Sequence, residues 1–433
     1  MLFSKLFKGD QKAKSAAQRV AARSKSATTV KSRKQHVEIN TKDLRVGMVV
    51  VELDKPWEES SFMFQTVDIT CTADIAAVQK ECSVVWVDYD DHSLQETKKP
   101  VPTHHRPKAI LGNSIDVTDE INNANNVHSM ANEAVSSLFD DIRLGQEIDG
   151  SVVKEAVSGC VDSILRNQDA SLWLTRMQAK NDGTAQHSMN VSALSIIMAK
   201  AMGLNNREME DVGVCGMLHD VGKTRISSDI IEKAAPLDPA EIAEMQRHTI
   251  YGRDILLSSK NVMSGAADVA FSHHERPDGL GFPQGLVDDQ IPIYSKIVAI
   301  AEAYDNMTMT QPYRAALSPS HALQELYKLR GKQFDEEFVV LFIDSVGIFP
   351  PGSIVEMVNK EVGIVLANTL DKLRPRVIMI LDSIGEPAIQ RIVDLSRLET
   401  DNEGTVYQIK TTHSDGAFGI NVGEFQRAGL RIG

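Results

Sequence analysis

The sequence is poor in aromatic residues and cysteine and has no long apolar run. Aromatic residues make up 5% of the chain, which argues against a surface built on aromatic stacking. The four cysteines form no CxxC pair and no zinc-like spacing, which favours a reduced, cytoplasmic location over a disulfide scaffold or a zinc ribbon. No apolar run approaches the ~20 residues of a membrane helix, and the opening MLFSKLFK is too short and too rich in lysine for a signal peptide.

Charge is distributed unevenly along the chain. The formal net charge is −13 and the isoelectric point is near 5.4, so the body of the protein is not expected to bind DNA or anionic lipid through nonspecific attraction. Residues 1–34 contain ten Lys or Arg and one Asp. We interpret residues 1–35 as a basic flexible tail, because their Ala, Ser, Gln and Lys content is more typical of a solvated segment than of a membrane-surface helix.

The next stretch predicts a small folded domain followed by a linker. From His36 onward, β-branched runs surround a glycine, and a short helix is expected at residues 73–81. A small α/β domain is therefore predicted over residues 36–92, and it has no catalytic constellation. KKPVPTHHRPK contains three prolines among charged residues, which predicts a linker over residues 93–109.

Helical periodicity dominates the middle of the chain. Apolar residues recur at intervals of three and four, and runs of strand formers are few. Gly203 is placed as a helix C-cap would be, and Asp238-Pro239 predicts a helix start with proline in the first turn. One helical domain is predicted over residues 110–345.

Strand-like segments follow this helical domain. After Pro350-Pro351-Gly352, the segments SIVEMVN, VGIVLAN, RVIMILD and QRIVDLS predict a β-rich extension over residues 346–400. Residues 401–433 are expected to be a loosely structured tail. The predicted fold class is mainly α, with a helical bundle domain, a small β-rich N-terminal domain and a β-rich C-terminal appendage.

Histidines and carboxylates occur at the ends of apolar helical stretches in the middle domain. They are His187, His219, Asp220, His248, His273, His274, Glu302 and Asp305. A single histidine in such a place is more often a satisfied core or surface residue than a ligand. Together they would be costly in a core unless something coordinated them, because buried polar groups need partners.

The adjacent pair His219-Asp220 predicts a site for two metal ions. Neighbouring helical residues diverge by about 100°, so the pair can straddle two ions, with the carboxylate bridging them and His273 and His274 at the neighbouring edge. Mixed nitrogen and oxygen ligands suit iron or manganese as well as zinc. Two ions ~3.5–4 Å apart activate water and clamp phosphoryl oxygens, so phosphoester hydrolysis is the expected reaction. Lys223, one turn on, can neutralise a phosphate oxygen, although the helix dipole alone also favours lysine there.

Several motifs carry a family resemblance. HDVGK, RHTIYG, HHERPDGLGFP and AEAYDNMTMTQPYR occur in this order between about residues 138 and 396. They resemble the HD-GYP family, metal-dependent phosphodiesterases of bacterial cyclic dinucleotides. Residues 36–90 resemble a small domain of unknown function that often precedes such modules. The resemblance implies an HD-type helical domain over residues 110–345, two divalent ions of iron or manganese, and hydrolysis of cyclic di-GMP to pGpG or GMP, or of 3'3'-cyclic GMP-AMP. A homodimer and signalling protein partners remain open alternatives.

The resemblance also implies the residues of the site. The metal ligands are His187, His219, Asp220, His248, His273 and His274, with Glu302 where the family usually has aspartate. The expected substrate-binding residues are Lys223, Asp278, Gly281, Phe282, Pro283, Asp305 and Arg314. Asp220 and Lys223 are the expected catalytic residues.

The chain departs from the family pattern at a few positions. Phe282 replaces the signature tyrosine, and Gln311 stands where many members have arginine. Gly183 stands where many members have a glutamate associated with a third metal, which favours two ions here. An active phosphodiesterase is the preferred interpretation. The alternatives are a module that binds the dinucleotide, turns it over poorly and signals through protein partners, and a structural interpretation in which the histidines are ordinary core residues.

Overall fold

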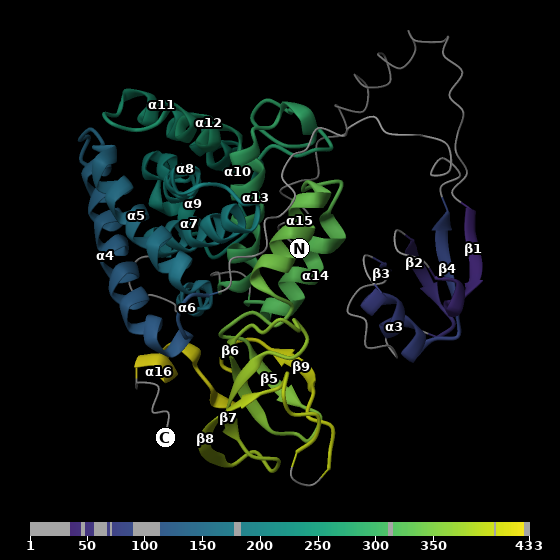
Figure 1. Cartoon of the computed structure of the whole chain (residues 1–433). Helices are drawn as coiled ribbons and strands as arrows, with labels where there is room; N and C mark the ends of the chain where they lie inside the picture. Colours follow the sequence, from purple (N-terminus) through teal and green to yellow (C-terminus); the bar gives the residue numbers. More distant parts are fainter. Residues whose placement is uncertain are drawn as a thin grey trace, which may run out of the picture. The chain divides into compact units, whose positions relative to one another are not determined.

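The computed structural model describes most of the chain, in two compact units within residues 10–104 and 105–433 (Figure 1). The described residues are 35–44, 48–55, 67–69, 72–89, 113–176, 183–310, 315–401 and 404–427. No helix among them is long and apolar enough to cross a membrane.

The smaller unit contains an antiparallel sheet. Its strands are β1 (Gln35–Asn40), β2 (Val49–Leu53), β3 (Val67–Asp68) and β4 (Val84–Tyr89), in the order β1-β4-β2-β3. Helix α3 (Thr72–Glu81) and the 3-10 turn η1 (Thr41–Asp43) complete it. Val50, Val78 and Val85 are fully buried in its core. The short helix expected at residues 73–81 is therefore confirmed.

The larger unit is built on helices, which confirms the mainly α fold class. Those that precede the C-terminal sheet are, in chain order, α4 (Val117–Arg143), α5 (Gly150–Arg166), α6 (Gln168–Leu174), α7 (Gly183–Ala201), α8 (Asn206–Leu218), η4 (Val221–Arg225), α9 (Ser228–Ile231), α10 (Pro239–Gln246), α11 (His248–Ser258), α12 (Ser264–Ser272), η5 (Asp288–Gln290), α13 (Ile293–Thr308), α14 (Pro319–Leu329) and α15 (Glu336–Val346). Helix α7 is buried on every side from residue 185 to residue 201 and contacts α4, α5, α8, α13 and α15. The central position of α7 matters because it carries His187.

The predicted helix boundaries have the expected chemistry. Gly203 follows α7 with φ +75°, a conformation that glycine adopts without steric cost. Asp238 caps α10 and forms a capping box with Glu241, with Pro239 in the first turn. Both boundary predictions are confirmed.

A five-stranded antiparallel sheet packs against the helices. Its strands are β5 (Ile354–Met357), β6 (Val362–Ala367), β7 (Arg376–Leu381), β8 (Pro387–Asp394) and β9 (Ile409–His413), in the order β8-β7-β6-β5-β9. One face forms a core with α4, α6 and α16 (Val422–Arg427), below the helices in Figure 1. Trp173 is fully buried there, and its indole N–H donates to the carbonyl of Leu366 at 2.9 Å.

The end of the chain corrects one expectation. Residues after 400 were expected to be loosely structured, but β9 pairs with β5 from Ile354 opposite His413 to Met357 opposite Ile409, and α16 packs in the core. The sequence IKTTH has too few apolar residues to signal a strand by alternation. Its hydrogen-bond partner lies some fifty residues earlier, so the strand depends on a contact distant in sequence.

Candidate metal centre

Helix ends, together with the interior of α13, bring the predicted ligands together. His187 lies in the first turns of α7, His219 and Asp220 join α8 to η4, and His248 begins α11. His273 caps the C-terminus of α12, His274 follows it, and Glu302 lies on α13. Their donor atoms fall into two groups, each within 4.8 Å: His187, His219, Asp220 and Glu302 in the first group, and His248, His273 and His274 in the second group.

The carboxylate of Asp220 lies between the two groups. Its Oδ2 is 3.7 Å from Nε2 of His187 and 3.3 Å from Nε2 of His219. Its Oδ1 is 3.4 Å from Nε2 of His248 and 3.9 Å from Nε2 of His273. Each oxygen therefore faces a different set of imidazoles, which is the arrangement that a carboxylate bridging two cations requires.

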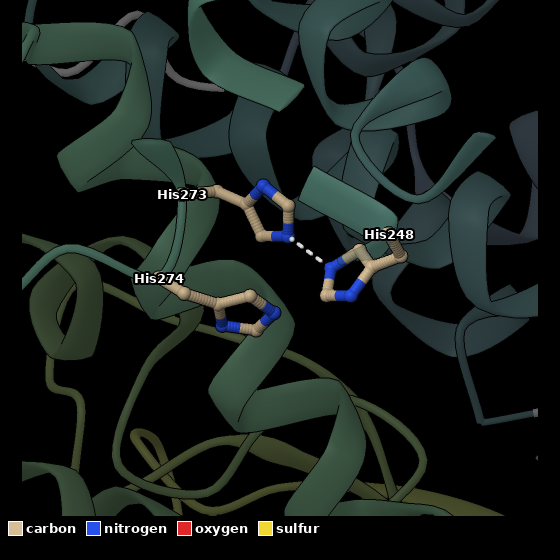
Figure 2. A group of neighbouring side chains, drawn as sticks. All are labelled: His248, His273 and His274. Atoms are coloured by element: carbon tan, nitrogen blue, oxygen red, sulfur yellow. Dashed lines mark hydrogen bonds between the residues drawn. The ribbon is translucent and has the colours of Figure 1, made fainter. Parts of the chain in front are cut away.

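Hydrogen bonds fix which imidazole nitrogen faces the centre. The Nδ1 atoms of His219, His248 and His273 contact backbone carbonyl oxygens three or four residues earlier, at 2.7, 2.6 and 3.0 Å. A carbonyl oxygen only accepts, so each Nδ1 carries the proton and each Nε2 offers a lone pair. The Nε2 atoms of His248 and His273 lie 3.3 Å apart (Figure 2). A cation bound to both would relieve the repulsion between these lone pairs.

Unpartnered buried atoms also fit a metal. Within the described part of the chain, Nε2 of His187, Nε2 of His219 and Oδ1 of Asp220 are buried without a hydrogen-bond partner. Each such group costs about 1–3 kcal/mol. Divalent cations would satisfy all three, and a set of imidazole and carboxylate ligands suits iron, manganese or zinc. The residues present therefore fit two metal ions.

The second group consists of neutral imidazoles. Burial lowers the pKa of His248 to about 4. Burial and the neighbouring imidazoles hold the pKa values of His273 and His274 well below the usual range. These three side chains can therefore bind a cation near neutral pH without first losing a proton.

The first group is shaped by the charge of Asp220. Burial alone would raise the pKa of Asp220, but Lys223 and His219 outweigh it and hold that pKa well below the usual range. Burial opposes protonation of His219, yet the carboxylate of Asp220 raises the pKa of this imidazole. The pKa of Glu302 is raised, chiefly by burial. An ionised Asp220 thus supplies the negative charge at the middle of the site.

Gly222 lets the His-Asp segment approach α11. A Cβ atom at this position would lie 1.9 Å from the carbonyl oxygen of His248 and 2.4 Å from the nitrogen of Gly252. Only glycine allows this backbone contact, and the contact sets Asp220 beside His248. We did not predict this role, although glycine in HDVGK was a visible signal.

Lys223 lies at the edge of the centre. Its ammonium group pairs with Oδ2 of Asp220, and its side chain is 25% exposed. The ammonium group of Lys223 therefore lies beside the carboxylate between the two groups and within reach of solvent.

The glycine- and proline-rich loop after His274 is tied to the centre by Glu275. Its buried carboxylate accepts the backbone N–H groups of Gln284 at 2.7 Å and Leu286 at 2.8 Å. A Cβ at Gly281 would lie 2.5–2.6 Å from the backbone of residues 274–276, so glycine permits the loop to fold back. Glu275 was not among the predicted site residues, although it lies within the HHERPDG motif.

The predicted substrate-binding residues have different surroundings. The carboxylate of Asp278 accepts from Arg276 and from the backbone N–H of Leu280 at 3.1 Å, so it holds the loop together. Phe282 packs its ring on His274, and Pro283, joined to it by a cis peptide bond, is exposed. Arg314 and Gln311 lie outside the described residues.

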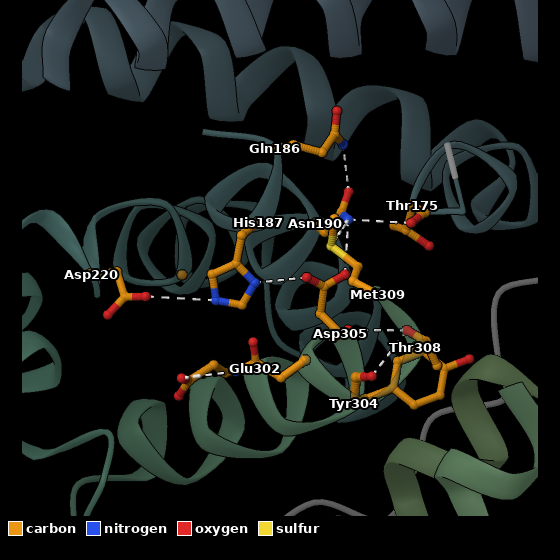
Figure 3. Close-up of polar contacts among 12 residues, drawn as sticks. Thr175, Gln186, His187, Asn190, Asp220, Glu302, Tyr304, Asp305, Thr308 and Met309 are labelled. Atoms are coloured by element: carbon orange, nitrogen blue, oxygen red, sulfur yellow. Dashed lines mark hydrogen bonds and ion pairs between the residues drawn. The ribbon is translucent and has the colours of Figure 1, made fainter. Parts of the chain in front are cut away.

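Asp305 lies behind the centre. It is 1% exposed, and its Oδ2 accepts from Nδ1 of His187 at 2.7 Å while its Oδ1 accepts from Asn190 at 2.8 Å (Figure 3). Both oxygens are thus occupied inside the protein, rather than directed at a substrate as expected. Asn190 was not predicted; its place one turn after His187 was the available signal.

A helical bundle that gathers a His-Asp pair and further imidazoles from several helices defines an HD-domain protein with a candidate two-metal centre. The HD domain family matches residues 168–338, and a domain of unknown function, DUF3391, matches residues 36–152. A cyclic di-GMP phosphodiesterase of Pseudomonas aeruginosa is 30% identical over 369 residues, covering 82% of this chain and 87% of that protein. The chain belongs to the HD-GYP family of phosphodiesterases.

Other relatives match a smaller part of the chain. The cyclic di-GMP phosphodiesterase response regulator RpfG of Xanthomonas campestris is 34% identical over 38% of this chain and 43% of that protein. A 3'3'-cGAMP-specific phosphodiesterase of Vibrio cholerae is 34% identical over 39% of this chain and 32% of that protein, so this chain spans less than half of either. The HDG"Y"P protein Bd1817 of Bdellovibrio bacteriovorus aligns over 72% of this chain and 99% of its own, with 14% identity and a TM-score of 0.45.

Proposed function

We propose that this phosphodiesterase hydrolyses a cyclic dinucleotide, cyclic di-GMP foremost, to pGpG or GMP. The carboxylate of Asp220 carries the proposal, because its two oxygens face two separate imidazole groups. The names of the relatives give the substrate class, and they include both cyclic di-GMP and 3'3'-cGAMP enzymes. Cyclic GMP-AMP is therefore the other substrate to be compared.

The proposed roles follow from the position of each side chain. His187, His219, Asp220 and Glu302 would hold one ion, and His248, His273 and His274 the other. Bound divalent ions would activate water and polarise the phosphoryl oxygens, and the mixed ligand set favours iron or manganese. Lys223 balances the negative charge that develops on the phosphate, and we assign the same role to Arg314 from the motif alone.

A second candidate function is a dinucleotide-binding effector with little turnover, which signals through protein partners. Glu302 favours it. In place of the usual aspartate, this longer side chain accepts a hydrogen bond from Asn306 at 3.2 Å and has a carboxylate oxygen 3.8 Å from Nδ1 of His274. The extra methylene moves this carboxylate relative to an aspartate at the same position, and in this second function the site would lose affinity for one ion in this way.

Organisation and location complete the proposal. We infer that residues 110–345 form the catalytic domain and that the protein acts in the cytoplasm. Cys82, Cys160 and Cys215 are free and buried, which supports a reducing compartment.

Turnover of two substrates tests the proposal. Protein loaded with Mn(II) or Fe(II) is incubated with cyclic di-GMP and with cyclic GMP-AMP, with and without chelator, and products are separated by chromatography. Asp220→Ala is the inactive reference, and Ser195→Ala, a buried change on α7 remote from the ligands, is the matched control. Chelator-sensitive product from either substrate supports the enzyme, whereas binding without product supports the effector.

A further inference from the structure

His187 is held from behind by a buried hydrogen-bonded chain. Its Nδ1 donates to Asp305 at 2.7 Å, which leaves Nε2 facing Asp220. The second oxygen of Asp305 accepts from Nδ2 of Asn190 at 2.8 Å. Figure 3 shows this arrangement, with Asp305 between the two side chains from α7.

Asn190 is fixed by neighbours on several elements. Besides Asp305 on α13, its Nδ2 donates to the carbonyl of Thr175 at 3.2 Å, and its Oδ1 accepts from Gln186 at 2.8 Å. The amide thus uses both donors and one acceptor. Asn190 is fully buried, so it is not placed to touch a substrate.

The chain of contacts continues away from the centre. Nε2 of Gln186 lies 3.4 Å from Nε2 of His128 on α4. Helices α4, α7 and α13 therefore meet through polar groups at this point.

The arrangement controls the direction of the Asp305 carboxylate. A buried carboxylate needs hydrogen-bond donors, and the amide of Asn190 donates to one oxygen while His187 donates to the other. With Asp305 fixed, Nδ1 of His187 keeps its proton and the lone pair of Nε2 points toward Asp220.

We propose that Asn190 is a positioning residue that acts through Asp305 to aim His187 at the ion held with His219, Asp220 and Glu302. The inference rests on the proposed two-metal function. It concerns one of the two ions. Within the described contacts, the hydrogen bonds of Asn190 lead to His187 and to none of His248, His273 or His274.

A titration with Mn(II) alone tests this role. Metal-free wild type, Asn190→Ala and Asn190→Asp are titrated, and free Mn(II) is followed by electron paramagnetic resonance. Loss of a support of this kind lowers metal affinity by about 10–100-fold, so one dissociation constant should rise by that factor while the other stays unchanged. Asn190→Asp replaces the amide that donates to Asp305 with a carboxylate, so two acceptors face each other. Asn190→Ala removes the donor without adding charge, and therefore keeps the test valid if the aspartate variant does not fold.

Two further variants make the result specific. Ser195→Ala, which changes another buried polar residue of α7 whose hydroxyl has no hydrogen-bond partner among the described residues, should bind both ions as wild type does. In a His187→Ala background, Asn190→Ala should cause no additional loss, because the two residues act in series. Wild-type affinity for both ions in a folded Asn190→Ala variant, or an additive loss in the double variant, would overturn the positioning role. Wild type that binds no Mn(II) would instead overturn the proposed function.

Discussion

The ring of Phe282 stacks on the imidazole of His274, with centroids 4.6 Å apart and planes 26° apart. Phe282 also meets His248 edge to face at 6.5 Å. The residue that replaces the signature tyrosine therefore packs on two candidate ligands of the same group. Its apolar ring contributes through this packing, which a tyrosine ring could equally provide.

Phe282→Ala should weaken the binding of the ion held by His248, His273 and His274. Removal of the ring frees His274 to rotate. We expect the dissociation constant of that ion to rise about tenfold, which is the lower end of the change in metal affinity when a residue that supports a ligand is removed. Phe282→Tyr keeps the ring and should leave both constants unchanged, while it raises the rate modestly if the missing hydroxyl serves the substrate. Mn(II) titration and initial rates measure the two effects. Equal affinities in the alanine variant and wild type would contradict the packing role.

Asp220→Ala should abolish the binding of both metal ions, and His219→Ala should weaken the binding of only one. The reason is geometric, since the oxygens of Asp220 face both imidazole groups whereas His219 belongs to the first. Metal content per chain after gel filtration, determined by plasma mass spectrometry, distinguishes the variants. Hydrolysis that persists in Asp220→Ala would show that the centre is assigned to the wrong residues.

Glu275→Gln should affect substrate binding more than metal binding. The glutamine is uncharged and can accept with only one oxygen, so one of the two loop N–H groups loses its acceptor, at a cost of about 1.5–3 kcal/mol. We expect KM for the dinucleotide to rise roughly tenfold or more while two ions per chain are retained. Gln284→Ala is the control, because the tether uses only the backbone N–H of this residue. An unchanged KM would mean that the loop closes without this tether.

Glu120 should make stability depend on pH in the acid range. It is 2% exposed and accepts from Arg166 and Ser163. Burial alone would raise its pKa, but Arg166 and the neighbouring donors outweigh it and lower the pKa below 4.5. A folded-state pKa below the unfolded value adds stability above about pH 4.5, and this contribution disappears as the pH falls through the folded pKa.

The matching experiment uses urea unfolding of metal-free protein between pH 6.5 and 3.5. Glu120→Gln should be less stable than wild type by about 1.5–3 kcal/mol near neutral pH, and the difference should shrink as the pH falls below 4.5. Asp140→Asn on the same helix, where the side chain is 69% exposed, should show little difference at any pH. A difference in the free energy of unfolding between Glu120→Gln and wild type that stays constant with pH would contradict the lowered pKa of Glu120.

Local chemistry explains how far the sequence could be interpreted. Helical periodicity, the caps at Gly203 and Asp238, and the imidazole-rich motifs depend on residues a few positions apart, so they predicted the helical domain and its candidate ligands. Strand β9 and the contact of Gly222 with α11 depend on partners distant in sequence, and neither was predicted.

The sequence by itself determined which residue types were available for the centre: imidazoles and carboxylates placed at helix ends, in motifs that define the family. Only the tertiary structure decided how they are used. In the folded protein, the two oxygens of Asp220 face different imidazoles, both oxygens of Asp305 are hydrogen-bonded in the interior, and the ring of Phe282 stacks on His274. These choices depend on how buried polar groups on separate helices satisfy one another, which residue order alone does not specify.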